Sequence, residues 1–126
     1  MHILPVYAAL LTLLFVFLSI RTIKARRRAQ VGLGTGDHPD LSRAVRVHAN
    51  FAEYAPLGLL LIYLVEIQSA ASWFVHLLGM LLLVGRLLHA YGVSQSRENF
   101  KFRVSGMVMT FSSLLLSAFF LLLHAV

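Results

Sequence analysis

The chain opens with the apolar run ILPVYAALLTLLFVFLSI at residues 3–20, followed at once by RTIKARRR at residues 21–28. The first part is apolar except for Thr12 and Ser19, and about 20 such residues form a helix long enough to cross a bilayer. A basic run stands where a signal-peptide cleavage site would lie, and no positive segment precedes the apolar run. We therefore expect a retained membrane span over residues 3–31 rather than a cleaved leader.

Three further apolar segments follow along the chain, and polar connections separate them. They predict helices over residues 41–65, 71–91 and 103–126. The composition agrees, because 59% of the 126 residues are hydrophobic and only 13% are charged, whereas soluble domains carry about 25% charged residues. The sequence predicts an all-α, integral membrane four-helix bundle in one domain, residues 1–126.

The positive charge is unevenly distributed along the chain, whose formal net charge is +6. Every Lys and Arg except Arg86 lies in or beside the first and third connections, and the second connection has none. Cytoplasmic loops of membrane proteins carry the excess of Lys and Arg. We expect loops one and three in the cytoplasm and both termini on the outer side. The charge is thus a topology signal, and no nucleic-acid partner is expected.

The chain contains no cysteine. This excludes disulfides and a protein thiol nucleophile, so any thiol chemistry requires a cosubstrate that brings the thiol. No metal site is expected.

A stripe of polar residues runs along the second predicted helix. At about 100° per residue, Arg43, Arg46, Asn50 and Glu53 fall on one face. An ionisable group at membrane depth costs about 2.5–3.5 kcal/mol on insertion scales. The stripe should therefore face other helices or a water-filled cleft, although Arg43 alone is equally well explained by snorkelling to the headgroups.

Two more helices bring polar groups to the same depth. Arg86 and His89 are neighbours on one face of the third helix, and Arg103 opens the fourth. Together with the stripe they resemble a pocket for a small zwitterionic or anionic molecule, since arginine binds carboxylates bidentately. Two simpler interpretations stay open: a buried structural ion pair between Arg86 and Glu53, and a packed His89.

The segment RVHANFAEYAP at residues 46–56 resembles the second-helix signature of the MAPEG family, the membrane-associated proteins of eicosanoid and glutathione metabolism. The resemblance extends over essentially the whole chain, and the short loops look most like the compact bacterial branch. It implies a homotrimer that binds glutathione between neighbouring subunits near the cytoplasmic side.

Residue roles are implied by matching positions of the same signature. Arg103 resembles the arginine that stabilises the glutathione thiolate. The residues that resemble the glutathione-binding set are Arg26, Arg46, His48, Asn50, Glu53, Tyr54 and His89, of which Arg26 and His48 would reach the tripeptide from the next subunit. Tyr54 also suits an interfacial anchor, and His48 points away from the stripe.

The chain departs from the family pattern in three ways. Val93 stands where members often have a tyrosine, and Met107 stands where some members have one. The third loop differs in length, so that Arg97 competes with Arg103 for the thiolate role. These departures make glutathione binding a firmer expectation than any one reaction.

The resemblance implies a glutathione-dependent membrane transferase or peroxidase that acts on lipophilic electrophiles or lipid hydroperoxides from the bilayer, in a bacterial inner membrane. Its expected partners are glutathione as cosubstrate, membrane lipids and two further copies of the chain. One alternative is a non-catalytic, lipid-binding or regulatory member of the family. A small multidrug transporter is disfavoured, because the first helix has no buried acid.

Overall fold

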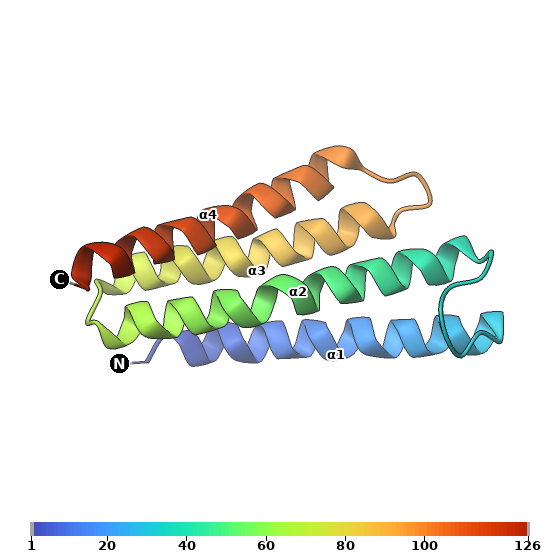
Figure 1. Ribbon diagram of the computed structural model, residues 1–126, viewed down its shortest axis with the longest axis horizontal. Helices are drawn as coiled ribbons and strands as arrows, with labels where there is room; N and C mark the ends of the chain where they lie inside the picture. Colours follow the sequence, from blue (N-terminus) through green and yellow to red (C-terminus); the bar gives the residue numbers. More distant parts are fainter. Residues whose placement is uncertain (1, 126) are drawn as a thin grey trace.

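The computed structural model describes residues 2–125 and contains four long helices (Figure 1). They are α1 (Leu4–Ala29), α2 (Pro39–Ile67), α3 (Ser72–Ser94) and α4 (Phe100–His124). All four are long and apolar enough to cross a membrane, and the described residues contain no strand. The predicted all-α bundle of four membrane-spanning helices is confirmed.

The helix ends differ from the predicted ones by a few residues. Helix α2 begins at Pro39 rather than residue 41, because proline fits the first turn of a helix, where its missing N–H is not needed. Helix α4 begins at Phe100 rather than residue 103, since the side chain of Asn99 caps it by accepting a hydrogen bond from the Phe102 backbone N–H (3.3 Å). The predicted end of the fourth helix at residue 126 lies outside the described residues.

The helices run alternately up and down the bundle, as Figure 1 shows. The α1–α2 and α3–α4 connections lie at one end, and the α2–α3 connection lies at the other with both termini. Helix α4 packs on α2 and α3 but does not contact α1 within the described chain. This arrangement leaves α2, α3 and α4 together around one part of the bundle.

Apolar side chains fill the inside of the bundle and also cover its outside. Leu11, Leu78 and Leu82 are fully buried in the core. Large apolar groups such as Leu13 (68% exposed) and Phe119 (59% exposed) point outward. An apolar exterior of this extent suits a protein whose solvent is lipid.

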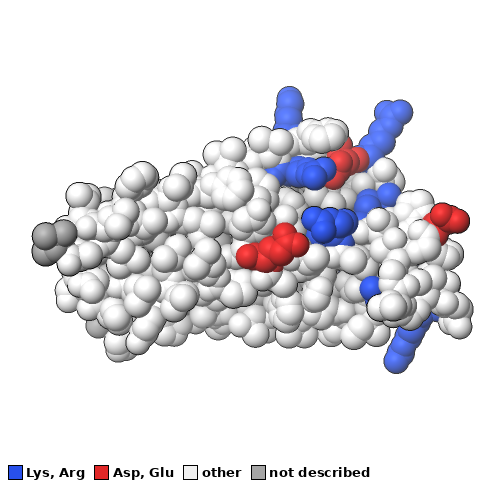
Figure 2. All heavy atoms as spheres, in the orientation of Figure 1, with Lys and Arg blue, Asp and Glu red and all other residues white. Residues whose placement is uncertain are grey.

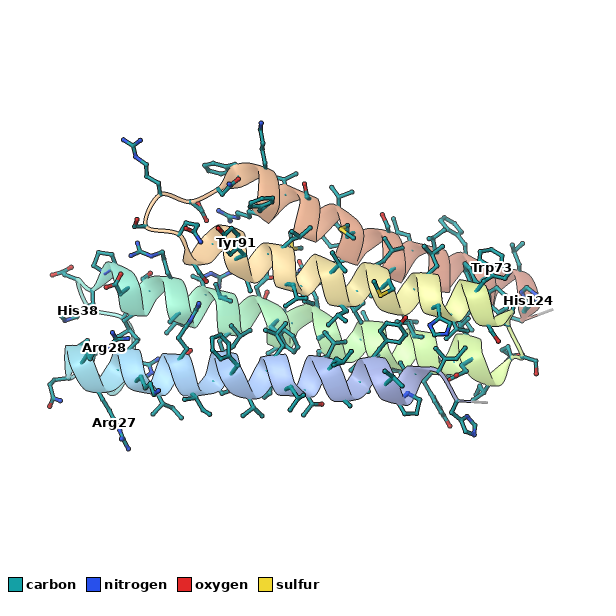
Figure 3. All side chains as sticks on the ribbon, turned by 180° about the vertical axis from the view of Figure 1, so that it is seen from behind. Arg27, Arg28, His38, Trp73, Tyr91 and His124 are labelled. Carbon is teal, nitrogen blue, oxygen red and sulfur yellow. The ribbon has the colours of Figure 1, made fainter. Side chains whose placement is uncertain are left out.

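The charged side chains gather toward one end of the molecule. Figure 2 shows Lys and Arg over the half that holds the α1–α2 and α3–α4 connections, while the opposite half is almost free of charge on this face. Trp73 and His124 lie at that opposite end (Figure 3), and Trp73 is exposed, as expected of an aromatic anchor at a membrane interface.

Candidate functional site

A polar cavity of about 320 Å³ opens between α2, α3 and α4 toward the basic end. Its volume lies at the lower end of the range for small-molecule sites, roughly 300–1,000 Å³. The residues that line it are Ser42, Arg43, Arg46, Asn50, His89, Val93, Gln95, Ser96, Glu98 and Arg103. Helix and loop residues that are far apart in the sequence thus meet at one site.

Arg86 lies buried behind this cavity, with only 2% of its surface exposed. Its Nε donates a hydrogen bond to the Thr110 hydroxyl (3.1 Å), and its Nη1 donates to the side-chain oxygen of Asn50 (2.5 Å). The guanidinium also lies over the Tyr54 ring, 5.4 Å from its centre. One side chain of α3 therefore joins α2 to α4 and fixes the wall of the cavity.

The structure does not contain the ion pair between Arg86 and Glu53 that the sequence left open as one interpretation, as judged from the described residues. Among the residues that the structure describes, the ion pairs are Arg43–Asp40 and Arg103–Glu98, and none involves Arg86. The neutral oxygens of Asn50 and Thr110 satisfy the guanidinium instead, while Glu53 is exposed on the outer face of α2.

The bond from Arg86 decides which way the Asn50 amide is turned. Arginine has only donors, so the atom of Asn50 that faces Arg86 must be its oxygen. Asn50 lines the cavity, and its NH₂ group keeps both donors because the bond to Arg86 uses only the oxygen. Asn50 thus offers hydrogen-bond donors to a ligand rather than an acceptor.

A close contact between α3 and α4 brings His89 and Arg103 together. A side chain at Gly106 would lie 2.5 Å from the backbone nitrogen of His89, and one at Gly92 would lie 2.6 Å from that of Arg103. Small residues let membrane helices approach to backbone contact in this way. His89 is buried, whereas the Arg103 side chain is 44% exposed and donates to Glu98 (2.6 Å).

Arg46 and Glu53 lie on the exposed face of α2. Neither forms an ion pair within the described chain. Glu53 is fourteen residues from Pro39 and fourteen from Ile67, which places it at the middle of α2. A carboxylate so deep in a membrane span should not face lipid. This face of α2 therefore requires a polar neighbour or an aqueous cleft.

Four residues of the set that resembles the glutathione-binding residues do not line the cavity: Arg26, His48, Glu53 and Tyr54. The Arg26 guanidinium donates to the Gly34 carbonyl (2.7 Å). His48 shares a hydrogen bond with the Ser19 hydroxyl (2.9 Å) and stacks on Phe15. Tyr54 lies below Arg86. The residues with a role implied by the resemblance that do line the cavity are Arg46, Asn50, His89 and Arg103.

The sequence did not reveal several lining residues of the third connection. Gln95, Ser96 and Glu98 border the cavity, but no helical periodicity predicts how this connection folds back over the helix ends. Arg97, the competing thiolate arginine, is not among the lining residues. Arg43 lines the cavity and pairs with Asp40 rather than only snorkelling.

Comparison with known proteins gives a consistent result. The model of the MAPEG family matches residues 4–123. The inner membrane protein YecN of Escherichia coli strain K12 is 38% identical over 110 residues, which cover 87% of this chain and 82% of that protein. YecN of Escherichia coli O6:H1 strain CFT073 matches to the same extent. No solved structure matches the chain.

Proposed function

Because this chain belongs to the MAPEG family, we propose that it binds glutathione in the cavity between α2, α3 and α4 and activates its thiol for transfer or peroxide reduction. The observation that carries the proposal is the convergence of Arg46, Asn50, His89 and Arg103 on that cavity. The absence of cysteine fits a reaction in which the cosubstrate supplies the sulfur.

The donor groups of the cavity suit the chemistry of glutathione, which carries two carboxylates, one amine and a thiol. Arg43 and Arg46 can bind carboxylates, and the free NH₂ of Asn50 can donate to a carbonyl or carboxylate oxygen. Glu98 supplies an acceptor for the ammonium group. These contacts would supply position, which is a large part of catalysis when two reactants must meet.

Arg103 is the proposed thiolate-stabilising residue. A free thiol has a pKa near 8.5, so only a few per cent is ionised at neutral pH. A guanidinium remains charged and favours the neighbouring thiolate, which lowers the pKa of the thiol. Arg103 lies on the cavity and is partly exposed, so it can reach a ligand there.

The chemical steps then require no group beyond the cosubstrates. In transfer, the thiolate forms a sulfur–carbon bond with a lipophilic electrophile, and the leaving group departs with the electron pair. In peroxide reduction, the thiolate attacks one peroxide oxygen, the oxygen–oxygen bond breaks, and the alkoxide takes a proton to leave as an alcohol. A second glutathione then converts the sulfenic acid to a disulfide and water.

A homotrimer would complete the site. Arg46 and the mid-span Glu53 are exposed on α2, and a second copy of the chain would cover them as membrane depth requires. Arg26 and His48, which do not line the cavity of their own subunit, would then reach the ligand of the neighbour. Tyr54 remains a supporting contact below Arg86.

We propose the bacterial inner membrane as the location, because the similar Escherichia coli protein is named for that membrane. The α1–α2 and α3–α4 connections would lie in the cytoplasm, since the basic residues gather there (Figure 2). The cavity would then open on the side where glutathione is made and kept reduced.

Calorimetric titration of the detergent-purified protein with glutathione tests the binding. Arg46→Ala should weaken affinity by roughly tenfold or more, because a charge-assisted hydrogen bond is lost. Arg27→Ala is the matched control, since Arg27 points away from the bundle (Figure 3) and should leave affinity unchanged.

Two outcomes would contradict the proposal. One is an Arg46→Ala protein, still oligomeric by light scattering, that binds glutathione as tightly as the parent. The other is a parent protein that binds no glutathione, which would favour the non-catalytic, lipid-binding alternative.

A further inference from the structure

A second polar cavity, of about 190 Å³, lies between α1, α2 and α3 at the same basic end. The residues that line it are Arg21, Ala25, Arg28, Asp40, Arg43, Ala44 and Ser94. It borders the proposed glutathione cavity, with which it shares Arg43. Nothing in the proposed reaction uses its other residues.

Charge in this second cavity is not balanced. Arg21, Arg28 and Arg43 contribute three positive charges, and Asp40 is the one acidic residue among those that line the cavity. Asp40 already accepts a hydrogen bond from Arg43. The cavity therefore carries a net positive charge, which favours an anionic ligand.

Arg21 shows the imbalance most clearly. Its Nη1 donates to the Ser94 hydroxyl (2.6 Å), but its Nε is buried without any hydrogen-bond partner. Native proteins rarely leave a buried donor unpaired, because the lost hydrogen bond to water is not replaced. Among the described residues no carboxylate pairs with Arg21.

The position of Arg21 along α1 matches the level of lipid headgroups. Arg21 is the first charged residue after the apolar run of residues 3–20. Arg28 lies two turns further toward the basic end, about 10 Å along the axis. With residues 3–20 in the hydrocarbon core, the two arginines would lie in the layer of the lipid phosphates.

An apolar stripe continues from Arg21 into the membrane. Leu10, Leu14 and Phe17 precede Arg21 at spacings of four and three residues, so they share its face of α1. Leu10 is 43% and Phe17 is 61% exposed. A molecule with a phosphate at Arg21 and an acyl chain along this stripe would match both parts of the surface.

We propose that this cavity binds the headgroup phosphate of an anionic phospholipid, with Arg21, Arg28 and Arg43 as its ligands and the Leu10–Leu14–Phe17 stripe as the seat of an acyl chain. Basic pockets between membrane helices on the cytoplasmic side are suited to anionic headgroups. Arginine binds phosphate through two parallel hydrogen bonds. The site shares Arg43 with the proposed glutathione cavity, but Arg21 and Arg28 line this cavity alone, so variants at those two positions test it separately from the proposed function.

Native mass spectrometry of the full chain in detergent at physiological ionic strength tests this proposal, with short-chain phosphatidylglycerol and phosphatidylcholine as competing probes. The parent should retain phosphatidylglycerol preferentially. Arg21→Gln and Arg28→Gln should each lower that preference by roughly fivefold, because each removes one phosphate contact. Arg27→Gln makes the same charge change on the outward side of α1 (Figure 3) and should change it by less than about twofold.

The Arg28→Gln variant keeps the test decisive if Arg21→Gln does not fold, since Arg28 is exposed and its removal leaves the helix packing intact. Equal losses in Arg28→Gln and Arg27→Gln would overturn the proposal, because they would indicate general surface attraction. Displacement of the lipid by an equal concentration of inorganic phosphate would also overturn it, because the acyl chain would then contribute nothing.

Discussion

Arg86 is a buried cation whose partners are neutral oxygens. Because the neutral groups of Asn50 and Thr110 accept its hydrogen bonds, no paired carboxylate offsets the positive charge of the guanidinium behind the cavity wall. The guanidinium also engages the side-chain oxygen of Asn50, which leaves the NH₂ group for other partners. Arg86 therefore acts as a positioning residue, and a ligand in the cavity meets an amide donor in a positive field.

Replacing Asn50 by aspartate separates two roles of this side chain: accepting a hydrogen bond from Arg86 and donating hydrogen bonds to a ligand. Asn50→Asp retains an oxygen for Arg86 but removes the NH₂ donors and adds a negative charge beside the ligand. Glutathione affinity should fall by roughly tenfold or more, with little loss of thermal stability. Asn99→Asp is the control, because it makes the same change at the α4 cap outside the lining residues. Unchanged affinity in Asn50→Asp would show that the ligand lies elsewhere.

Glu98 competes with the ligand for Arg103, to which it is paired at 2.6 Å. Removing this negative charge in Glu98→Gln should stabilise a bound thiolate further. The pH at which the thiolate absorbance is half-developed should fall, by on the order of half a unit. Asp37→Asn carries the same charge change at an exposed position outside the cavity and should cause no shift. A rise in the midpoint would contradict the role of Arg103.

Helical periodicity predicted some of these residues and missed others for a clear reason. It gives the direction of a side chain around its own helix, which was enough to find Arg46 and Asn50. It does not give the neighbour that the side chain meets, so it left open an ion pair between Glu53 and Arg86 that is not among the ion pairs of the described residues. Glu98 lies in a connection between helices, where no period applies.

At the scale of elements, the contact between α3 and α4 sets the geometry of the cavity. The two helices approach so closely at Gly106 that its α-carbon lies against the backbone of His89. A shift of α3 relative to α4 would therefore move His89 relative to Arg103. Glycine at this position is therefore part of the site, although it carries no functional group.

Gly106→Ala should destabilise the protein by about 1–3 kcal/mol, because the added methyl group would overlap backbone atoms at 2.5–2.6 Å. It should also weaken glutathione binding by separating His89 from Arg103. Thermal unfolding in detergent measures the first effect. Gly32→Ala is the control, since nothing lies within 4 Å of the added group. Equal stability of both variants would contradict the close contact.

At the scale of the whole molecule, the sequence predicted the four spans because bilayer thickness fixes the length of an apolar helix. The same sequence could not show how α4 packs on α2 and α3 without α1. That arrangement depends on which small residues of one helix pack against which residues of another, and the sequence does not give these contacts. It is the arrangement that places Arg103 on the cavity.

The orientation of the protein in the membrane can be tested by labelling single introduced cysteines. Because the protein has no cysteine, single cysteines at Leu33 and Gln68 report on opposite ends without background. Both positions are exposed. A membrane-impermeant thiol reagent added to spheroplasts should label Gln68→Cys at once and Leu33→Cys only after the membrane is opened. The reverse pattern would contradict the proposed orientation.

Glutathione held as a thiolate beside Arg103 would absorb near 240 nm, so ultraviolet difference absorption detects the proposed species. The purified parent, titrated with glutathione at neutral pH, should develop a thiolate band. Arg103→Ala should lose this band, whereas Arg97→Ala, which removes the same charge outside the lining residues, should keep it. No band in the parent at saturating glutathione, or an unchanged band in Arg103→Ala, would contradict this proposal.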